Sequence, residues 1–235
     1  VRGESVPGIE LGDLGDPRLK PERTREFEAG FDLSMLDERV RLEATYYNKQ
    51  SKDALINRTL PPSAGLSANR YENIGAVKNA GLETLLGATL LELDPLQWSA
   101  TLSMAWNKNE LVTLGVPEII SGAQRFVEGY SLGGYWDYPI LGFADADANG
   151  LITADEIEVG DEVVYLGSVL PTRQASLTSD LTFLTHFRLS GLLDYRGGYL
   201  QENSTEEFRC AIGTCRGVVD PDAPLEEQAR GFAAA

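Results

Sequence analysis

Strict alternation between apolar and polar residues is the feature that most constrains the fold of this chain. In EFEAGFDLSM, residues 26–35, every second residue is apolar and the residues between are acidic or small. A repeat of two residues places successive side chains on opposite faces of a β-strand and fits no helix. After a polar turn near Asp37 and Glu38, residues 39–49 alternate in the same way. The two stretches are therefore predicted to pair as a hairpin.

Four further stretches repeat this pattern in two adjacent pairs, each pair separated by a short turn. They are residues 73–93, 97–108, 175–183 and 187–195. The second of them has one wholly apolar face, which carries a tryptophan near each end, at Trp98 and Trp106. We expect six strands arranged as three hairpins.

The lengths of the connections distinguish between two all-β folds. The turns near residues 37, 94 and 185 are short, whereas the connections near 57–70, 110–172 and after about 200 are long, polar and rich in Gly and Pro. Short turns at one end and long loops at the other, with aromatics near the strand ends, are typical of bacterial outer-membrane barrels. We predict an all-β antiparallel meander that forms part of such a transmembrane β-barrel. The alternative is a soluble β-sandwich with one buried face.

Composition limits the possible partners. The chain has 235 residues, 43% of them apolar, and a formal net charge of −16. That charge is repelled by nucleic acid and by anionic head groups, but it favours divalent cations. No apolar run approaches the ~20 residues that a membrane helix needs, and the N-terminal stretch lacks the pattern of a secretory signal. The chain is thus expected either to be soluble or to meet membrane lipid through strands.

The stretch DADANGLITADE, residues 145–156, has the spacing of a calcium-binding loop. Gly150 stands at the sixth place, where the loop turns sharply, and Ile152 at the eighth. Gly and Pro in the preceding SLGGYWDYPILGF argue against the helix that a calcium switch would need. We therefore predict a structural ion in a long outer loop, the alternative being an acidic surface turn. The expected ligands are Asp145, Asp147, Asn149, the carbonyl of Leu151, Thr153 and Glu156.

The cysteines and the single histidine carry weaker signals. Cys210 and Cys215 flank Gly213, and in an oxidising compartment they are expected to form a disulfide; in the cytosol they would stay thiols. His186 lies in a predicted polar turn and has no evident acid–base partner, so we expect an exposed turn residue and not a general base.

The hairpin sequences resemble those of SusC-like TonB-dependent outer-membrane transporters. Residues 19–56 are similar to a hairpin in the later part of that barrel, and residues 73–91 with 98–114 to the next one. The acidic glycine-containing segment from Asp145 and the run LGSVLPTRQASL from Leu166 also occur in this order in the family. In combination, these motifs extend the resemblance over about Leu19 to Tyr199.

The resemblance implies an outer-membrane barrel with a plug, energised through TonB, that imports glycan or peptide fragments together with a surface lipoprotein. Two features depart from that plan. No plug or TonB box is evident, and six strands fall far short of the roughly 22 of a plugged transporter barrel. Residues 1–235 are therefore expected to be a partial barrel without plug and closing strands, with residues 145–156 as a calcium-loop insertion.

Three classes of function follow from these features. The first is a portion of a nutrient-uptake transporter, and the second is a soluble calcium-stabilised adhesin or glycan-binding module. The third and weakest is an outer-membrane hydrolase, which would have to use His186. We expect no enzyme. The polar face would line the lumen through Glu26, Glu28, Asp32, Arg39, Arg41, Glu43, Asp180, Arg188, Asp194 and Arg196. Four aromatics could stack on sugars, with membrane-girdle or packing roles as alternatives: Tyr130, Tyr135, Trp136 and Tyr138.

Overall fold

The computed structural model describes residues 15–60, 69–184 and 186–233. The chain divides into two compact units. The first comprises Val1–Gly133 and Pro171–Gly198, and the second comprises Gly134–Leu170 and Tyr199–Ala235. The segments 1–14 and 61–68, which include part of the predicted connection near 57–70, lie outside the described residues.

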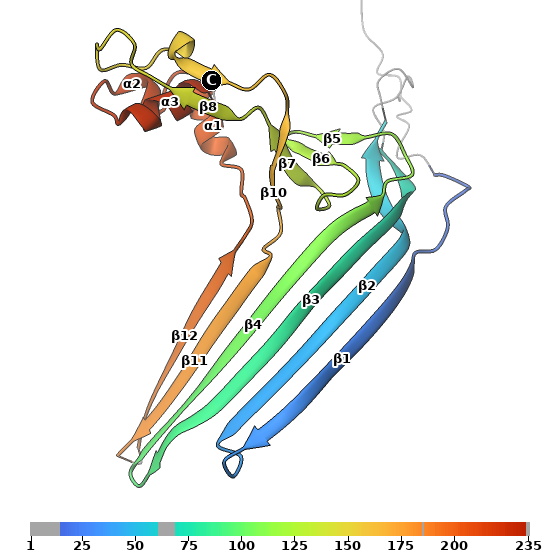
Figure 1. Ribbon diagram of the computed structural model, residues 1–235, viewed down its shortest axis with the longest axis vertical. Coiled ribbons are helices and arrows are strands. Elements are labelled where there is room, and N and C mark those ends of the chain that lie inside the picture. Colours follow the sequence, from blue (N-terminus) through green and yellow to red (C-terminus); the bar gives the residue numbers. More distant parts are fainter. Residues whose placement is uncertain (1–14, 61–68, 185, 234–235) are drawn as a thin grey trace, which may run out of the picture. The chain divides into compact units, whose positions relative to one another are not determined.

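The first unit is built on a six-stranded antiparallel sheet (Figure 1). Its strands are β1 (Arg23–Met35), β2 (Val40–Thr59), β3 (Asn69–Leu93), β4 (Leu96–Thr113), β11 (Arg173–Phe183) and β12 (Phe187–Gly197). They are neighbours in the order β1-β2-β3-β4-β11-β12, so the three predicted hairpins are confirmed. β2 and β3 extend beyond the alternating stretches, pairing as far as Thr59 with Asn69. Backbone hydrogen bonding does not require alternation, so the sequence pattern underestimated the lengths of these two strands.

The register brings the apolar residues of all six strands onto one face. Directly opposed residues of an antiparallel sheet share a face. One row of opposed residues is leucine in every strand: Leu33, Leu42, Leu86, Leu102, Leu177 and Leu193. The parallel row two residues away along the strands contains Phe31, Ala44, Thr84, Met104, Ala175 and Tyr195.

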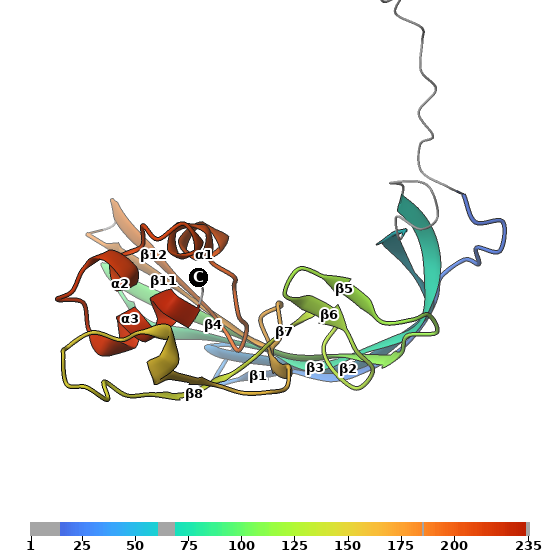
Figure 2. The ribbon, with the colours of Figure 1, turned by 90° about the horizontal axis from the view of Figure 1, so that it is seen from above.

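The apolar face is not covered by a second sheet within the described part of the chain. Phe27 keeps 62% of its surface exposed and Leu193 keeps 68%. Figure 2 shows the sheet as an open, curved wall, and among the described residues its edges β1 and β12 pair with no further strand. An apolar face of this extent needs a lipid or protein covering, because soluble monomers do not expose one. Within the described residues, no second sheet covers this face as the sandwich alternative requires.

The outer ends of β3 and β4 carry a small core on the opposite face. Val77 and Leu111 continue the rows of the polar face beyond Asn79 and Asn109, and both are buried together with Leu114. The hairpin of β5 (Ile119–Ser121) and β6 (Gln124–Phe126) packs on them. The start of the long connection 110–172 therefore folds back over the polar face of the sheet, and the core is built from residues between 54 and 132.

The second unit combines short strands with helices. β7 (Gly134–Asp137) pairs with β10 (Val164–Gly167), and β8 (Ile140–Phe143) pairs with β9 (Ile157–Val159). The 3-10 helix η2 (Ala154–Glu156) precedes β9, and the C-terminal part forms α1 (Ser204–Ala211), α2 (Arg216–Val219) and α3 (Leu225–Ala233).

These helices are an addition to the expected all-β chain, which is otherwise confirmed. The sequence predicts a polar connection after residue 200. The helices found there have 8, 4 and 9 residues, which is too short to produce a clear apolar period in the sequence. Tertiary contacts stabilise them, since Gln228, Ala229 and Gly231 of α3 are buried. Among the described residues, no helix has the length and apolar character needed to cross a bilayer.

The leucine row leads to a test of strand orientation. Leu102 belongs to this row, whereas Thr101 is opposed to Gly87 and Thr178 on the polar face. Leu102→Arg should therefore cost ~2–4 kcal/mol of folding free energy in a bilayer, and Thr101→Arg should cost much less. Unfolding in lipid vesicles and heat-modifiable gel mobility would measure the difference. Equal costs for the two substitutions would contradict the assignment of faces.

Candidate functional site

The polar face of the sheet brings together the charged residues that the alternation assigns to it. Asp180 accepts hydrogen bonds from Arg188 at 2.7 Å and from Ser190 at 2.6 Å, across the β11–β12 pair. Within single strands, Arg41 pairs with Glu43 at 2.6 Å and Arg196 with Asp194 at 3.3 Å. Glu43, Asp180 and Asp194 thus each have a basic partner on the same face.

Gly81 lets one aromatic ring lie flat on this face. Tyr47 is opposed to Gly81, which is opposed to Asn107, and the Tyr47 hydroxyl donates across the glycine to Asn107 Oδ1 at 3.0 Å. A Cβ atom at position 81 would lie 2.7 Å from the Tyr47 ring. The absent side chain of Gly81 therefore makes room for the ring and its hydrogen bond.

A shallow depression of about 370 Å³ lies near the middle of the polar face. Glu43, Glu83 and Asp194 contribute carboxylates to its lining, and Gln174 contributes an amide. The lining combines acids, hydroxyls and small apolar side chains, with no guanidinium or ammonium group. Glu43 and Asp194 pair with Arg41 and Arg196, which lie outside the lining.

Backbone N–H groups of the loop at residues 145–156 donate to the acids at its two ends. Asp145 accepts from the backbone N–H groups of Asn149 at 3.0 Å and Gly150 at 2.8 Å, and Gly150 adopts a positive φ of 82°. Glu156 accepts from the N–H of Ala146 at 2.8 Å and of Thr153 at 3.0 Å. The first and last acids of the motif thus draw the two halves of the loop together.

Three of the six predicted ligands converge. One carboxylate oxygen from each of Asp145, Asp147 and Glu156 lies within 4.8 Å of the other two. Oxygens bound to one calcium at about 2.3–2.6 Å are separated by at most about 5 Å, so the spacing fits that ion. The side chains of Asn149 and Thr153 are directed within the loop: Asn149 Nδ2 donates to Asp147 and Thr153 Oγ1 to Glu156.

The hydrogen bonds to Glu156 keep its carboxylate ionised. The backbone N–H groups of Thr153 and Ala146 lower the pKa of Glu156 below its usual range, against the opposing effect of the Asp145 charge. An anionic Glu156 is the form that a cation requires. The backbone N–H groups of the loop thus hold the Glu156 carboxylate in place near Asp145 and Asp147.

Gln228 holds the middle of this loop, and the sequence carried no local signal for it. Ile152, at the eighth place of the motif, is 1% exposed, and its N–H donates to Gln228 Oε1 at 2.8 Å. The two residues are separated by 76 positions in the chain. A contact of that sequence separation cannot be read from a motif.

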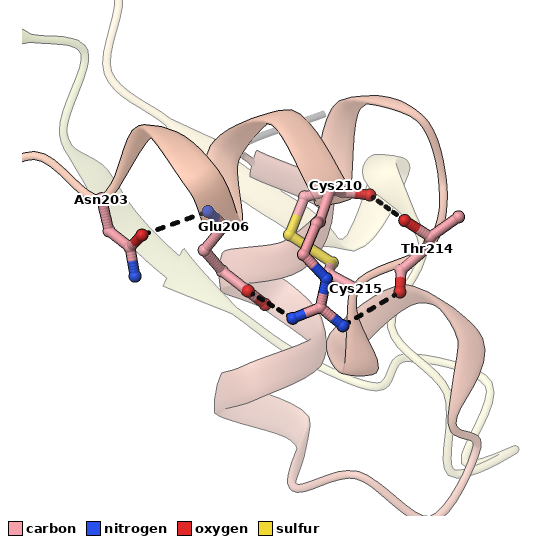
Figure 3. The surroundings of a disulfide bond; sticks show 6 residues. Asn203, Glu206, Cys210, Thr214 and Cys215 are labelled. Atoms are coloured by element: carbon pink, nitrogen blue, oxygen red, sulfur yellow. Dashed lines mark hydrogen bonds and ion pairs between the residues drawn. A yellow bond between two sulfur atoms is a disulfide. The ribbon is translucent and has the colours of Figure 1, made fainter.

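The cysteine pair joins two of the C-terminal helices (Figure 3). Cys210 lies in the last turn of α1, and Cys215 is the N-cap of α2, with their Cα atoms 4.7 Å apart. Asn203 caps the start of α1 by accepting from Glu206 N at 3.1 Å, and Thr214 N donates to the carbonyl of Arg209 at 2.8 Å. The Asn203 cap, the hydrogen-bonded turn and the disulfide together fix α1 relative to α2.

The aromatic candidates and His186 lie in different surroundings in the structure. Trp136 packs edge-on against Tyr165 with ring centroids 5.5 Å apart, whereas Tyr130 and Tyr138 are exposed. His186 lies in the short β11–β12 turn, with its Nδ1 2.9 Å from the carbonyl oxygen of Leu184. That turn is at the opposite end of the sheet from the long connections. The exposed turn position expected for His186 is confirmed.

Comparison with known families agrees with this geometry. The sequence profile of the TonB dependent receptor-like β-barrel family matches residues 6–214. The chain belongs to this family. It is 30% identical over 197 residues to TonB-dependent receptor P26 of Formosa agariphila, a match that covers 73% of this chain and 20% of that protein. TonB-dependent receptor SusC of Bacteroides thetaiotaomicron is 28% identical over 96 residues, covering 41% of this chain and 10% of SusC.

Solved structures of the family share the fold. The structure of the RagAB peptide transporter matches with a TM-score of 0.69 at 20% identity, over 89% of this chain and 25% of that one. The closed-closed state of the RagAB peptide importer matches with a TM-score of 0.62 at 18% identity, over 76% of this chain and 21% of that one. The chain spans about a fifth of the length of the curated relatives P26 and TonB-dependent receptor P3, which is also from Formosa agariphila.

Membership of the TonB-dependent receptor-like β-barrel family assigns environments to the two faces. The family consists of outer-membrane transport proteins and not of enzymes. In outer-membrane barrels the apolar face of each strand contacts lipid and the other face lines the lumen. The leucine row therefore faces lipid, and Asp180, Arg188 and the Tyr47–Asn107 pair face the lumen.

The disulfide between α1 and α2 leads to a prediction about the exported protein. In protein recovered from the outer membrane, Cys210 and Cys215 should resist alkylation until a reductant is added. Closing so short a loop constrains the unfolded chain by roughly 2 kcal/mol, so its loss should loosen α1 and α2 without unfolding the sheet. Mass spectrometry of alkylated peptides measures this. Both thiols reacting before reduction would refute the disulfide.

Proposed function

We propose that this chain forms part of the wall and outer loops of an outer-membrane receptor that imports glycan or peptide fragments. The observation that carries the proposal is the two-faced sheet, apolar and exposed on one side and polar with compensated charge on the other, in a chain of the TonB-dependent receptor family. A lumen lined by polar side chains admits hydrated nutrients, which lipid excludes.

We further propose TonB and a surface lipoprotein as the working partners of the receptor. The proposal rests on sequence similarity, since the relatives are named TonB-dependent receptors and one of them is SusC. The RagAB structure is that of a peptide transporter, which supports peptide fragments as one substrate class beside glycans. The chain itself would supply lumen wall and long loops to such a complex.

Calcium is proposed as a structural ion of the loop 145–156. The three converging carboxylates and the ionised Glu156 support this assignment, with Asn149, the Leu151 carbonyl and Thr153 completing the set. The ion would neutralise part of the acidic charge and order the loop. Since the flanking β8 and β9 are short strands and not helices, no opening of a helix pair is expected.

The import proposal is tested by nutrient uptake in cells that lack the receptor gene. Uptake of fluorescent oligosaccharides and of fluorescent peptides should be measured separately, with a strain lacking TonB as the reference for energised import. We expect loss of one of the two classes, restored by the wild-type receptor and by Thr101→Arg but not by Leu102→Arg. Unchanged uptake of both classes would contradict the proposal.

Calcium titration with limited proteolysis tests the loop. Calcium should protect residues 140–165 from cleavage in the wild-type receptor, and Glu156→Gln should abolish the protection because it removes a bidentate anionic ligand. Asp161→Asn, an acid outside the motif, is the matched control and should keep the protection. If the wild-type loop is cut equally fast in calcium and in chelator, the loop is an acidic turn that binds no ion.

A further inference from the structure

Gln228 is the most completely buried polar side chain of the second unit. It lies in α3 and is 2% exposed. Its Oε1 accepts from Ile152 N at 2.8 Å, and its Nε2 donates to the carbonyls of Ala223 at 2.8 Å and Gly150 at 3.3 Å. A buried amide without hydrogen-bond partners would destabilise the fold. The amide of Gln228 therefore ties the loop at Gly150 and Ile152 to the start of α3.

The contact with Ile152 determines the direction of a predicted calcium ligand. The N–H of Ile152 and the C=O of Leu151 belong to one planar trans peptide unit, in which they point in opposite directions. Because Gln228 binds the N–H, the Leu151 carbonyl must point away from α3. That carbonyl occupies the seventh place of the loop, where calcium loops use a backbone oxygen as a ligand.

A second contact fixes the preceding peptide unit. Gln228 Nε2 reaches the carbonyl of Gly150, so one side chain holds the peptide units on both sides of Leu151. Gly150 has a positive φ of 82° and no Cβ atom, so it could otherwise rotate readily. The amide of Gln228 removes that freedom.

The position of α3 in turn depends on a close approach to α2. A Cβ atom added at Gly217 of α2 would lie 2.2 Å from the carbonyl oxygen of Glu227, the residue before Gln228. Arg216 also binds Glu227 at 3.3 Å. Figure 1 shows α2 and α3 as neighbours, and α3 also contacts β8 and η2. Any shift of α3 would therefore move the Gln228 amide away from the loop.

We propose that Gln228 is a positioning residue of the calcium loop, which couples ion binding to the docking of α3. This inference rests on the proposed calcium function of residues 145–156. Coupling between two parts of a protein is reciprocal, so the ion should stabilise α3 as much as a docked α3 strengthens ion binding. The C-terminal helices would then be ordered when calcium is bound.

The test uses the intact receptor in detergent, with calcium as the only added ligand. Calorimetry should show that Gln228→Met, which keeps the volume but removes the polar contacts, weakens calcium binding about tenfold, which is about 1.4 kcal/mol of binding free energy. Gln201→Met makes the same chemical change at an exposed site and should leave the affinity unchanged. Gly217→Ala, which touches no loop residue, should also weaken binding by displacing α3.

Hydrogen exchange of residues 225–233 supplies the reciprocal measurement. In the wild-type receptor, adding calcium should slow exchange in α3, and Gln228→Met should remove that effect even if calcium still binds. If Gln228→Met and Gly217→Ala both bind calcium with the affinity of the wild-type receptor, the coupling is overturned and the calcium site remains. A wild-type receptor that binds no calcium would overturn both the site and the coupling.

Discussion

The pairing of backbone groups between β2, β3 and β4 is the interaction on which the rest of the first unit depends. These three long strands stay paired from the short turns to the outer loops, with register shifts in the β3–β4 pair near Leu90 and Val112. In lipid no water can satisfy an unpaired N–H or C=O group, so strands that cross a membrane must pair these groups with one another. The register also decides which side chains share a face, and hence which face meets lipid.

Much of this could be predicted from sequence, for a physical reason. A strand in a two-sided environment must place an apolar residue at every second position, so Phe27 to Met35 and Trp98 to Trp106 reveal both the element and its faces. The calcium-loop motif is equally local, since its acids and glycine lie within 12 residues. The convergence of Asp145, Asp147 and Glu156 followed from that spacing.

What escaped prediction depends on contacts between distant segments. The packing of β5 and β6 on Leu111 follows a switch from polar to apolar on one face of β4, between Asn109 and Leu111. The strand alone does not show which segment of the chain covers this apolar end. α1, α2 and α3 are short, and their order comes from a disulfide, a close glycine contact and the buried Gln228. None of these partners is near in sequence to residues 145–156, which α3 contacts through Gln228.

The central claim is that successive residues of β4 alternate between lipid and the water-filled lumen. The most direct measurement is a nitroxide scan of residues 98–105, one label at a time, in receptor assembled in a bilayer. Labels at Trp98, Ala100, Leu102 and Met104 should be relaxed mainly by dissolved oxygen, and labels at Ser99, Thr101, Ser103 and Ala105 by a water-soluble nickel chelate. A period of two in the ratio of the two accessibilities is the predicted result, and a uniform or inverted ratio along the strand would contradict it.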